Sequence, residues 1–373
     1  EWRVTFFPPL NDQRRMWILK MLRTEKVTSV FDVGCGEGQL LECLVRPAPW
    51  LPPRTEDTLG SDTFVYLHLR TVHGADISTE DLATSVELTT PAPPNPDPLF
   101  RELRWEDLTV QIWKGGLEVP NTALEGIECI AAMEVIEHLP ATILPSFAPV
   151  LLGRYHPRLL LFTTPSYTFN ERFRPEGSTA PWGTPDPTQR TDRLFRHPDH
   201  KFEWTPEECA SYCTAAAEAW GYDVQLDGVG RALERDPWGR DERCGFATQV
   251  VLFRRREGQE HARRRRDAWE AWARDNCAAG PPHELLATQR FEAHKSAGKP
   301  APLEQVEAEL VRLIEEWGAM SVCVREFWRE ESVATLCGGR IEVLLEAIER
   351  HELLALHRAD GEDISDWEVS WLG

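Results

Sequence analysis

A glycine-rich turn between a predicted strand and a predicted helix limits what this 373-residue chain can fold into. Residues 27–33 (VTSVFDV) are rich in β-branched side chains, and the turn G-C-G-E-G follows at 34–38. Leu40, Leu41 and Leu44 then share one face of a helix. Strand, glycine turn and helix form the first half of a βαβ unit, which predicts a parallel sheet.

The same alternation of strands and helices continues to about residue 256. Further strands are expected at 72–76, 108–113, 126–132, 158–163, 222–228 and 246–253, and helices after the N-caps Ser78 and Thr205. Proline-rich stretches at 47–53 and 91–98 are neither helix nor central strand. The last two strands follow each other directly and predict an antiparallel hairpin at one edge. We therefore expect an α/β protein with the seven-stranded, Rossmann-like sheet of adenosylmethionine-dependent methyltransferases.

Residues 257–373 show helical periodicity instead. Apolar side chains recur every three or four positions over 303–317 and 341–348. The sequence thus divides into a methyltransferase domain at 1–256 and a C-terminal helical extension at 257–373, to which no role is assigned.

The net charge of the chain does not by itself exclude binding of nucleic acid at a local site. The chain has 41 Lys and Arg against 61 Asp and Glu, a formal charge of −20, which argues against a general nucleic-acid-binding protein. However, residues 281–373 hold 9 basic and 19 acidic residues, half of the excess, whereas residues 1–26 hold six basic and three acidic residues. An acidic total is therefore compatible with a local basic surface.

The cysteines and the hydropathy pattern indicate where the protein works. Nine cysteines without a C-x-x-C pair favour reduced thiols, and Cys209 and Cys213, one helical turn apart, are expected to pack together. No apolar run approaches the ~20 residues of a transmembrane helix. We expect a monomer in the cytoplasm or the nucleus, not secreted and without a membrane span.

The glycine turn also predicts a cofactor site, because glycines let the backbone pass close to a ligand. Asp76, at the end of the next strand, can accept hydrogen bonds from both ribose hydroxyls of a nucleoside. The pattern D-x-G-x-G-x-G differs from the dinucleotide pattern G-x-G-x-x-G, and Glu37 adds a negative charge, so cationic S-adenosylmethionine is favoured over NAD. The expected contacts are Asp32, Gly34, Cys35, Gly36, Asp76 and Ile77. The alternative is a simple tight turn, with Asp76 capping the next helix.

A second group of polar residues follows the strand expected at 126–132. Glu134, Glu137 and His138 stand at i, i+3 and i+4, so in a helical turn all three face the same way. Two carboxylates and an imidazole suit Mn²⁺, Co²⁺ or Fe²⁺ somewhat better than Mg²⁺. On spacing alone, a solvated helix start with an incidental histidine is favoured over a metal site.

The segment F-R-H-P-D-H-K-F-E-W-T at 195–205 narrows these possibilities. Together with E-x-x-E-H at 134–138, it resembles the small-RNA 2′-O-methyltransferases, which modify the 3′-terminal ribose of plant microRNAs and animal Piwi-bound RNAs. Three further stretches share the resemblance, which covers roughly residues 6–256. They are 7–10 (FPPL) with Gln13-Arg14, 31–41 (FDVGCGEGQLL) and 163–170 (TTPSYTFN).

The resemblance implies a reaction and a ligand set. Its implied metal ligands are Glu134, Glu137, His138 and His200, which would hold one divalent cation (Mg²⁺, or Mn²⁺ or Co²⁺) on the 2′ and 3′ hydroxyls of the terminal nucleotide. The implied activity is methyl transfer from S-adenosylmethionine to that 2′-hydroxyl, which protects the 3′ ends of small RNAs, with an Argonaute or Piwi protein as a partner. By resemblance plus charge, the candidates for the terminal phosphates are Arg14, His197 and Lys201.

Two other functions stay open at this point. A small-molecule or protein methyltransferase on the same fold would not require a free 2′,3′-diol on its substrate. A non-catalytic module that binds small RNA or Argonaute would not bind S-adenosylmethionine and would not need the complete set of glycine, acid and ligand positions. Single-stranded, duplex and Argonaute-bound RNA are not distinguished by these residues.

Overall fold

The computed structural model describes residues 3–52, 66–93, 102–180, 182–276, 281–358 and 364–373. The predicted proline-rich stretches are therefore described only over 47–52 and 91–93, and their remaining residues lie outside the described ranges.

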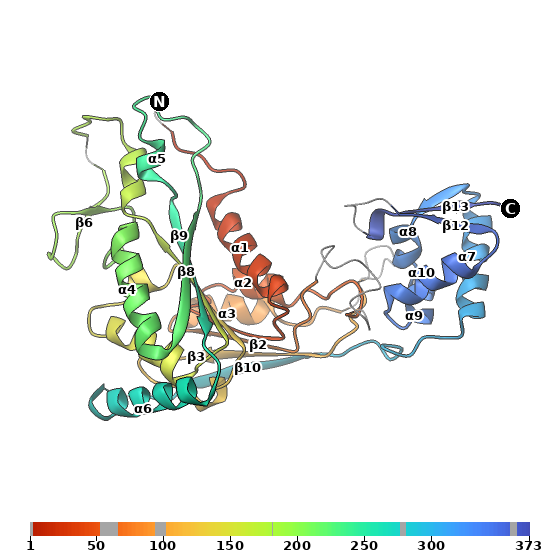
Figure 1. Ribbon diagram of the computed structural model, residues 1–373, viewed down its shortest axis with the longest axis horizontal. Coiled ribbons are helices and arrows are strands. Elements are labelled where there is room, and N and C mark those ends of the chain that lie inside the picture. Colours follow the sequence, from red (N-terminus) through yellow and green to blue (C-terminus); the bar gives the residue numbers. More distant parts are fainter. Residues whose placement is uncertain (1–2, 53–65, 94–101, 181, 277–280, 359–363) are drawn as a thin grey trace.

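An eight-stranded sheet forms the larger part of the structure (Figure 1). In spatial order the strands are β10 (Glu284–Phe291), β3 (Leu108–Lys114), β2 (Thr71–Asp76), β1 (Ser29–Val33), β4 (Cys129–Met133), β5 (Leu159–Pro165), β9 (Thr248–Arg255) and β8 (Tyr222–Val229). From β3 to β5 all neighbours are parallel, whereas β9 runs antiparallel to both β5 and β8. The predicted parallel sheet with an antiparallel hairpin at one edge is confirmed.

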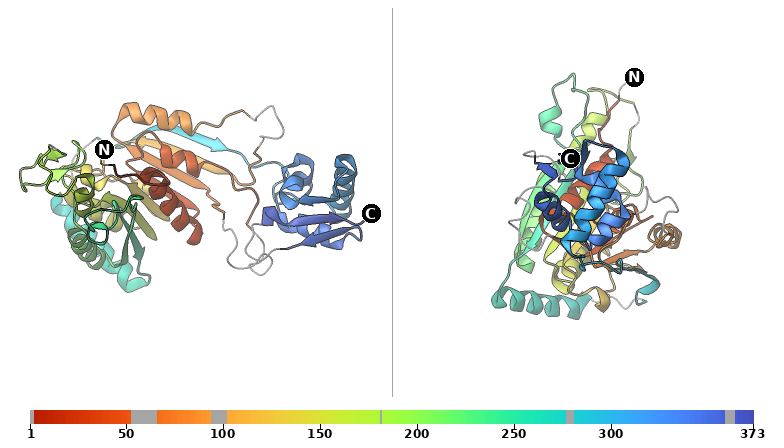
Figure 2. Two further views of the ribbon diagram at one scale, coloured as in Figure 1. Left: turned by 90° about the horizontal axis from the view of Figure 1, so that it is seen from above. Right: turned by 90° about the vertical axis from the view of Figure 1, so that its right-hand side faces the viewer.

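Helices cover both faces of this sheet, as Figure 2 shows from two further sides. One face carries α1 (Leu10–Thr24), α2 (Gln39–Leu44) and α3 (Thr79–Leu88), and the other carries η6 (Pro149–Arg154), α4 (Pro206–Trp220) and α6 (Gln259–Asn276). Successive strand residues alternate between the two cores, as Val30 and Phe31 do. Cys209 and Cys213 are buried on the α4 side with their sulfurs 3.9 Å apart, which confirms them as packing residues.

Shorter elements connect these layers. They are η3 (Thr122–Leu124), η4 (Ile136–His138), η5 (Leu144–Ser146), η7 (Thr168–Phe173), α5 (Asp241–Cys244) and a small sheet of β6 (Thr184–Pro185) and β7 (Leu194–Phe195). Among the described residues, no helix combines the length and the apolar character that crossing a bilayer requires.

The sheet has one strand more than the seven expected. Strand β10 pairs antiparallel with β3 from Glu284 opposite Lys114 to Phe291 opposite Leu108. Most of its side chains are exposed or half-buried, because backbone pairing rather than burial holds this edge strand. Its sequence therefore carries little hydrophobic pattern. Since both α6 and β10 pack on the sheet, the larger domain extends beyond the boundary predicted at residue 256.

Residues 303–373 form a smaller lobe, drawn in blue in Figure 1. Its elements are α7 (Leu303–Trp317), α8 (Val324–Arg329), α9 (Glu331–Leu336), α10 (Ile341–Arg350), η8 (Ile364–Asp366) and a three-stranded antiparallel sheet of β11 (Ser321–Cys323), β13 (Glu368–Trp371) and β12 (Leu354–His357). The expected helices are present, but this region also contains strands that were not predicted, because strands of three or four residues are too short to show an alternating pattern.

One of the proline-rich stretches connects the lobe to the large domain. The indole nitrogens of Trp105 and Trp328, one from each part, both donate to the carbonyl oxygen of Pro49, at 2.9 and 2.8 Å. Trp50 is buried in the hydrophobic core of the lobe. The stretch 47–52, which had no inferred role, thus anchors the lobe to the sheet domain.

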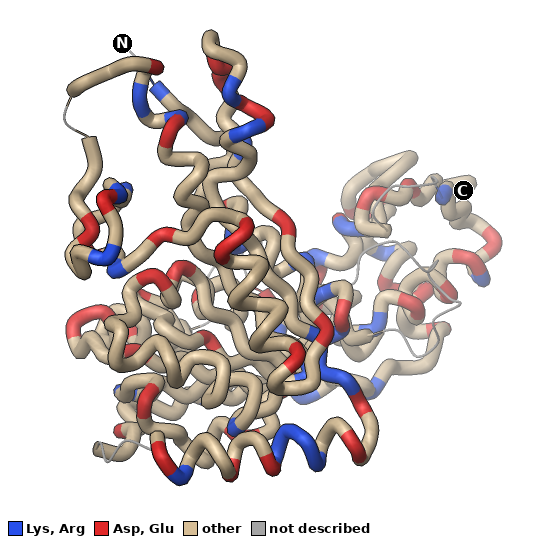
Figure 3. Tube along the Cα trace, turned by 60° about the vertical axis from the view of Figure 1, so that its left-hand side comes forward, with Lys and Arg blue, Asp and Glu red and all other residues tan. Residues whose placement is uncertain are grey.

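Charge is distributed over both parts of the chain, and Figure 3 shows acidic and basic residues interspersed along them. In the arginine run on α6, Arg265 is buried and donates to the carbonyl oxygens of Gly221 and Arg256 at 3.2 and 3.3 Å. Its neighbours Arg264 and Arg266 are exposed. One arginine of the run is therefore structural.

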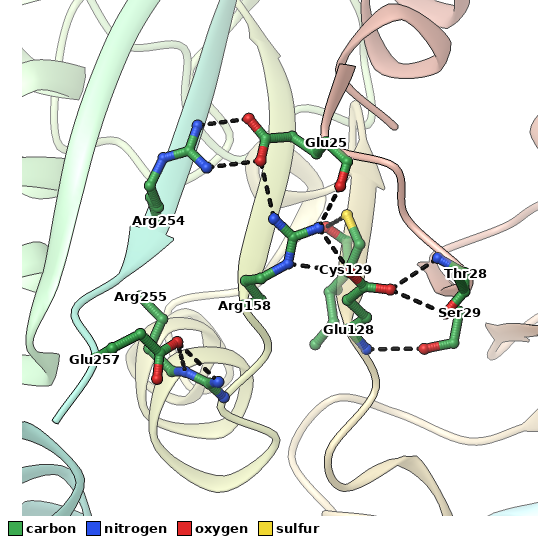
Figure 4. A network of polar contacts seen from close by, with 10 residues as sticks. Glu25, Thr28, Ser29, Glu128, Cys129, Arg158, Arg254, Arg255 and Glu257 are labelled. Carbon is green, nitrogen blue, oxygen red and sulfur yellow. Dashed lines mark hydrogen bonds and ion pairs between the residues drawn. The ribbon is translucent and has the colours of Figure 1, made fainter. Parts of the chain in front are cut away.

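Ion pairs hold the amino ends of the central strands together (Figure 4). Arg158, just before β5, contacts Glu25 at 2.9 Å and Glu128 at 2.6 Å, and Glu128 accepts from the backbone of Thr28 at 2.7 Å. Arg254 of β9 contacts Glu25 at 2.6 Å. Hydrogen bonds from Arg254 and Arg158 hold the pKa of Glu25 below its ordinary value. This network joins the end of α1 to four strands, β1, β4, β5 and β9.

We expect Arg158→Met to lower the free energy of unfolding by about 2 kcal/mol at pH 7, because it leaves two partly buried carboxylates without their shared partner. The pKa of Glu25 is lowered in the folded state, so its stabilisation is complete above the unfolded pKa of about 4.3 and is lost as the pH falls through the folded value. Urea titrations at pH 7 and at lower pH should therefore show the difference narrowing in acid. Arg256→Met, which removes an exposed pair with Asp223 on the same hairpin, is the control and should change stability by less than about 0.5 kcal/mol. Equal effects of the two variants would contradict this account.

Candidate functional site

A cavity of about 620 Å³ lies at the carboxyl edge of the parallel strands, where ligands bind in open α/β sheets. The glycine turn after β1, the loop after β4 and the segment before α4 all contribute to its wall. Of the predicted site residues, those that line it are Arg14, Asp32, Gly34, Cys35, Gly36, Glu134, His138, His197 and His200. The fold therefore brings the predicted cofactor turn and the predicted metal site to one cavity.

The glycine turn follows a path that requires glycine at Gly34. The φ angle there is +66°, and a Cβ atom would lie 2.6 Å from Cγ2 of Val135. Its backbone nitrogen donates to the carbonyl oxygen of Ala75 on the neighbouring strand at 2.8 Å. Beside it, Asp32 is buried, and this burial together with the charge of Asp76 raises its pKa to about 8. A buried carboxyl group at the cavity wall favours a cationic ligand group.

Asp76 connects the glycine turn to the residue that caps the following helix. Its Oδ2 accepts from the backbone nitrogen of Gly36 at 3.0 Å, and its Oδ1 accepts from that of Ser78 at 2.9 Å. The N-cap of the following helix is Ser78, whose side chain accepts from the backbone nitrogen of Asp81, so the alternative in which Asp76 caps that helix is not what the structure shows. Each oxygen of Asp76 keeps a second lone pair for a ribose hydroxyl. Asp76 and the exposed Ile77 do not line the cavity wall, so their cofactor contacts stay a prediction.

Glu137, His138 and His200 form a compact donor cluster. One potential ligand atom from each lies within 4.8 Å of the others. Glu137 is fully buried, and its Oε2 accepts from Thr164 at 3.0 Å, whereas its Oε1 has no hydrogen-bond partner among the described residues. Burial and the neighbouring charge of Glu134 raise the pKa of Glu137 well above its ordinary value. A divalent cation would satisfy this oxygen, so the donor set fits a metal ion.

Glu134 lies at the same cavity but outside this cluster. Its φ angle is +56°, which is not a right-handed helical value, and the short helix η4 begins only at Ile136. The expectation that one helical turn carries all three residues was therefore wrong. Its Oε1 accepts from Thr163 at 2.8 Å, and its Oε2 pairs with Arg14 at 2.7 Å. A guanidinium group therefore neutralises Glu134, and Arg14, predicted for substrate phosphate, contacts a predicted metal ligand.

Glu203 is a neighbour of the donor cluster that the sequence analysis did not name. Its Oε1 lies 2.6 Å from Nδ1 of His200 and accepts from the backbone nitrogen of Arg196 at 2.8 Å, and its Oε2 accepts from Asn170 at 2.5 Å. Its burial opposes ionisation, but hydrogen bonds from His200 and Asn170 and the charge of Arg196 lower its pKa. With Nδ1 held in this way, His200 presents Nε2 as its ligand atom. The spacing H-x-x-E within 200–203 was the available signal.

The remaining predicted residues differ in their surroundings and in whether they line the cavity. Burial and the neighbouring His200 and His197 lower the pKa of His138, so its imidazole is held neutral. His197 lines the cavity and is half exposed. Lys201 does not line the wall, but its backbone nitrogen donates to the carbonyl oxygen of Glu137 at 2.7 Å. Lys201 therefore joins the two halves of the site through its backbone.

Comparisons with known proteins agree with this geometry, although no family model matches the chain. The chain is 30% identical over 258 residues to a small RNA 2′-O-methyltransferase of Arabidopsis thaliana, which is 67% of this chain and 23% of that protein. It is 30% identical over 262 residues to the protein of the same description from Xenopus tropicalis, covering 70% of this chain and 59% of that protein. This sheet domain is related to the small RNA 2′-O-methyltransferases.

A solved structure extends this relationship to three dimensions. The crystal structure of the small RNA methyltransferase HEN1 matches with a TM-score of 0.52 and 25% identity, over 78% of this chain and 28% of that one. The expected Rossmann-like methyltransferase fold and the resemblance to the small RNA 2′-O-methyltransferases are confirmed. The chain spans less than two thirds of the length of these two curated relatives.

We expect Glu203→Gln to weaken Mn²⁺ binding about 10-fold, because a neutral amide orients His200 less firmly and leaves its imidazole less basic. Calorimetric titration of the protein with Mn²⁺ alone measures this affinity without any turnover. Glu207→Gln, at an exposed position on the first turn of α4, is the matched control and should bind Mn²⁺ as the unmodified protein does. Unchanged affinity in Glu203→Gln would remove Glu203 from the site.

Proposed function

We propose that this chain transfers a methyl group from S-adenosylmethionine to the 2′-hydroxyl of the 3′-terminal nucleotide of small RNAs, with the help of a divalent cation. The observation that carries the proposal is the single cavity at which the glycine turn and the donor cluster meet. Methyl transfer needs donor and acceptor in line and in contact, so one cavity with two adjacent binding sites suits it. The relatives described as small RNA 2′-O-methyltransferases support the choice of substrate.

The donor cluster would hold Mg²⁺, Mn²⁺ or Co²⁺. Glu137 contributes its unpartnered oxygen, His200 its Nε2, and His138 a neutral imidazole. Such a cation supplies a positive charge that lowers the pKa of a ribose hydroxyl, which is a poor nucleophile at neutral pH. The proton that leaves this hydroxyl would pass to water, because a neutral imidazole that ligates the cation has no second lone pair to accept it.

The glycine turn would hold the cofactor. S-adenosylmethionine supplies an activated methyl group on a cationic sulfonium. The buried carboxyl of Asp32 and the side chain of Glu37 line the same cavity and favour its positive groups. Asp76 keeps lone pairs for the ribose of the cofactor while it fixes the turn.

Recognition of an RNA end follows from the same arrangement. Only a terminal ribose has free 2′ and 3′ hydroxyls, so a site that binds both excludes internal nucleotides. Arg14 and His197 stand at the cavity and are proposed to contact the terminal phosphates, with Lys201 nearby. An Argonaute or Piwi protein as the carrier of the RNA, and a location in the cytoplasm or nucleus, complete the proposal.

We expect Glu137→Gln to abolish methyl transfer, at least about 1,000-fold, because it removes the buried charge that the cation requires. Transfer of a radiolabelled methyl group to a single-stranded small RNA measures this, and EDTA should abolish it reversibly. Glu218→Gln, at an exposed position on α4, should keep full activity. Full activity of Glu137→Gln, or of the unmodified protein in EDTA, would contradict the metal assignment.

The identity of the acceptor is tested with RNA whose terminal diol has been oxidised by periodate. The proposal predicts no methylation of this RNA and full methylation of the untreated RNA. Methylation of both would favour another target on the same fold.

We expect Gly34→Ala to weaken S-adenosylmethionine binding about 10-fold or more, because the added Cβ displaces the turn from Val135. Gly126→Ala is the matched control, since its φ of +75° carries the same conformational cost but nothing lies within 4 Å of the new atom. It should lower stability by about 1 kcal/mol and leave cofactor affinity unchanged. Equal affinities of the two variants in calorimetry would place the cofactor elsewhere.

A further inference from the structure

Two aromatic rings, Phe173 and Trp182, stand out at a cavity with many charged residues. Their ring centroids are 5.9 Å apart and their planes are 14° apart, so the rings are stacked. Both line the cavity that also contains His197 and His200. Phe173 ends η7, and Trp182 precedes β6, in the segment between β5 and α4 that projects at the left of Figure 1.

The aromatic pair packs on side chains that are themselves held in place. The guanidinium carbon of Arg196 lies 5.5 Å from the ring centroid of Phe173, and Phe169 contacts the same ring edge to face at 5.5 Å. Arg196 is itself held by hydrogen bonds to the side chain of Asn170 at 3.0 Å and to the carbonyl oxygens of Ser166 and Ala247 at 2.5 and 2.9 Å. Phe173 in the stacked pair therefore has hydrogen-bonded and closely packed neighbours, unlike a ring in a loose surface cluster.

This stack adjoins the atoms that the proposed function assigns to the terminal ribose. Asn170, which supports Arg196 under Phe173, also donates to Glu203, which positions His200. The aromatic pair and the donor cluster are thus parts of one hydrogen-bonded framework. A nucleotide whose ribose hydroxyls lie at the cluster must place its base elsewhere in the cavity. A flat aromatic surface is the partner that a base prefers, and stacking accepts every base because each has a π face.

We propose that Phe173 and Trp182 form a stacking platform for the base of the 3′-terminal nucleotide. The platform gives affinity for the terminal base without a choice among the four bases. This inference rests on the proposed function and adds the part of the substrate that the catalytic groups do not contact.

The experiment combines a change in the protein with a matching change in the RNA. The substrates are a small RNA and the same RNA with an abasic terminal ribose that keeps its 2′ and 3′ hydroxyls. For the unmodified protein, removal of the base should raise KM about 10-fold and change kcat much less, because the reacting groups are intact. Trp182→Ala should raise KM for the normal RNA by a similar factor and should no longer respond to the loss of the base.

Two further variants separate stacking from general damage. Trp182→Phe keeps an aromatic ring and should restore most of the affinity. Trp238→Ala changes a tryptophan that is partly exposed and does not line the cavity, so both of its KM values should equal those of the unmodified protein. The four terminal bases should give KM values within about threefold of one another.

These experiments distinguish failure of the stacking platform from failure of the proposed function. Methylation of normal and abasic RNA with equal KM by the unmodified protein would overturn the platform and leave the activity standing. An undiminished response of Trp182→Ala to base removal would do the same. Absence of methyl transfer to any RNA would overturn the proposed function and the platform with it.

Discussion

The site depends on the burial of one carboxylate, that of Glu137. A carboxylate with no exposed surface requires a compensating partner, yet one of its oxygens has none among the described residues. The loop that carries it is fixed to the strand ends by Thr164 and to the segment before α4 by the backbone nitrogen of Lys201. That segment delivers His200, already oriented by Glu203. Burial of the Glu137 carboxylate costs folding free energy, and the surrounding contacts hold the carboxylate in place. This arrangement is expected of a metal site.

Much of this site could be predicted because its chemistry is carried by contiguous residues. The glycine turn and the two short motifs each keep their donors within a few positions, so their spacing is visible in the sequence. The pairing of Arg14 with Glu134 was not visible, because it joins α1 to the loop after β4, and only the fold brings them together. The left-handed backbone of Glu134 was hidden for a similar reason, since its sequence also suits a helix. The role of Glu203 was missed because a buried carboxylate beside a histidine has no pattern beyond its spacing.

The fold could be predicted where hydrophobic periodicity is strong and not where backbone pairing replaces it. Strands β1, β2, β4 and β5 are almost wholly buried and β3 is buried at alternate residues, whereas β10 is an exposed edge strand and the strands of the lobe have three or four residues. The lobe also bears on the acidic total charge. Its described arginines, among them Arg312 and Arg350, pair with neighbouring glutamates, so their charge is not available to a phosphate backbone. Under the proposed function, the arginines of the lobe would therefore contribute little to RNA binding.

The proposed function requires that cofactor and cation bind side by side in one cavity. Anomalous diffraction from crystals grown with Mn²⁺ and S-adenosylhomocysteine tests it directly. The account predicts one strong manganese peak at about 2.2 Å from the ligand atoms of Glu137, His138 and His200, with the cofactor product in the glycine turn beside it. A manganese peak elsewhere, or cofactor bound with no metal at these residues, would contradict it.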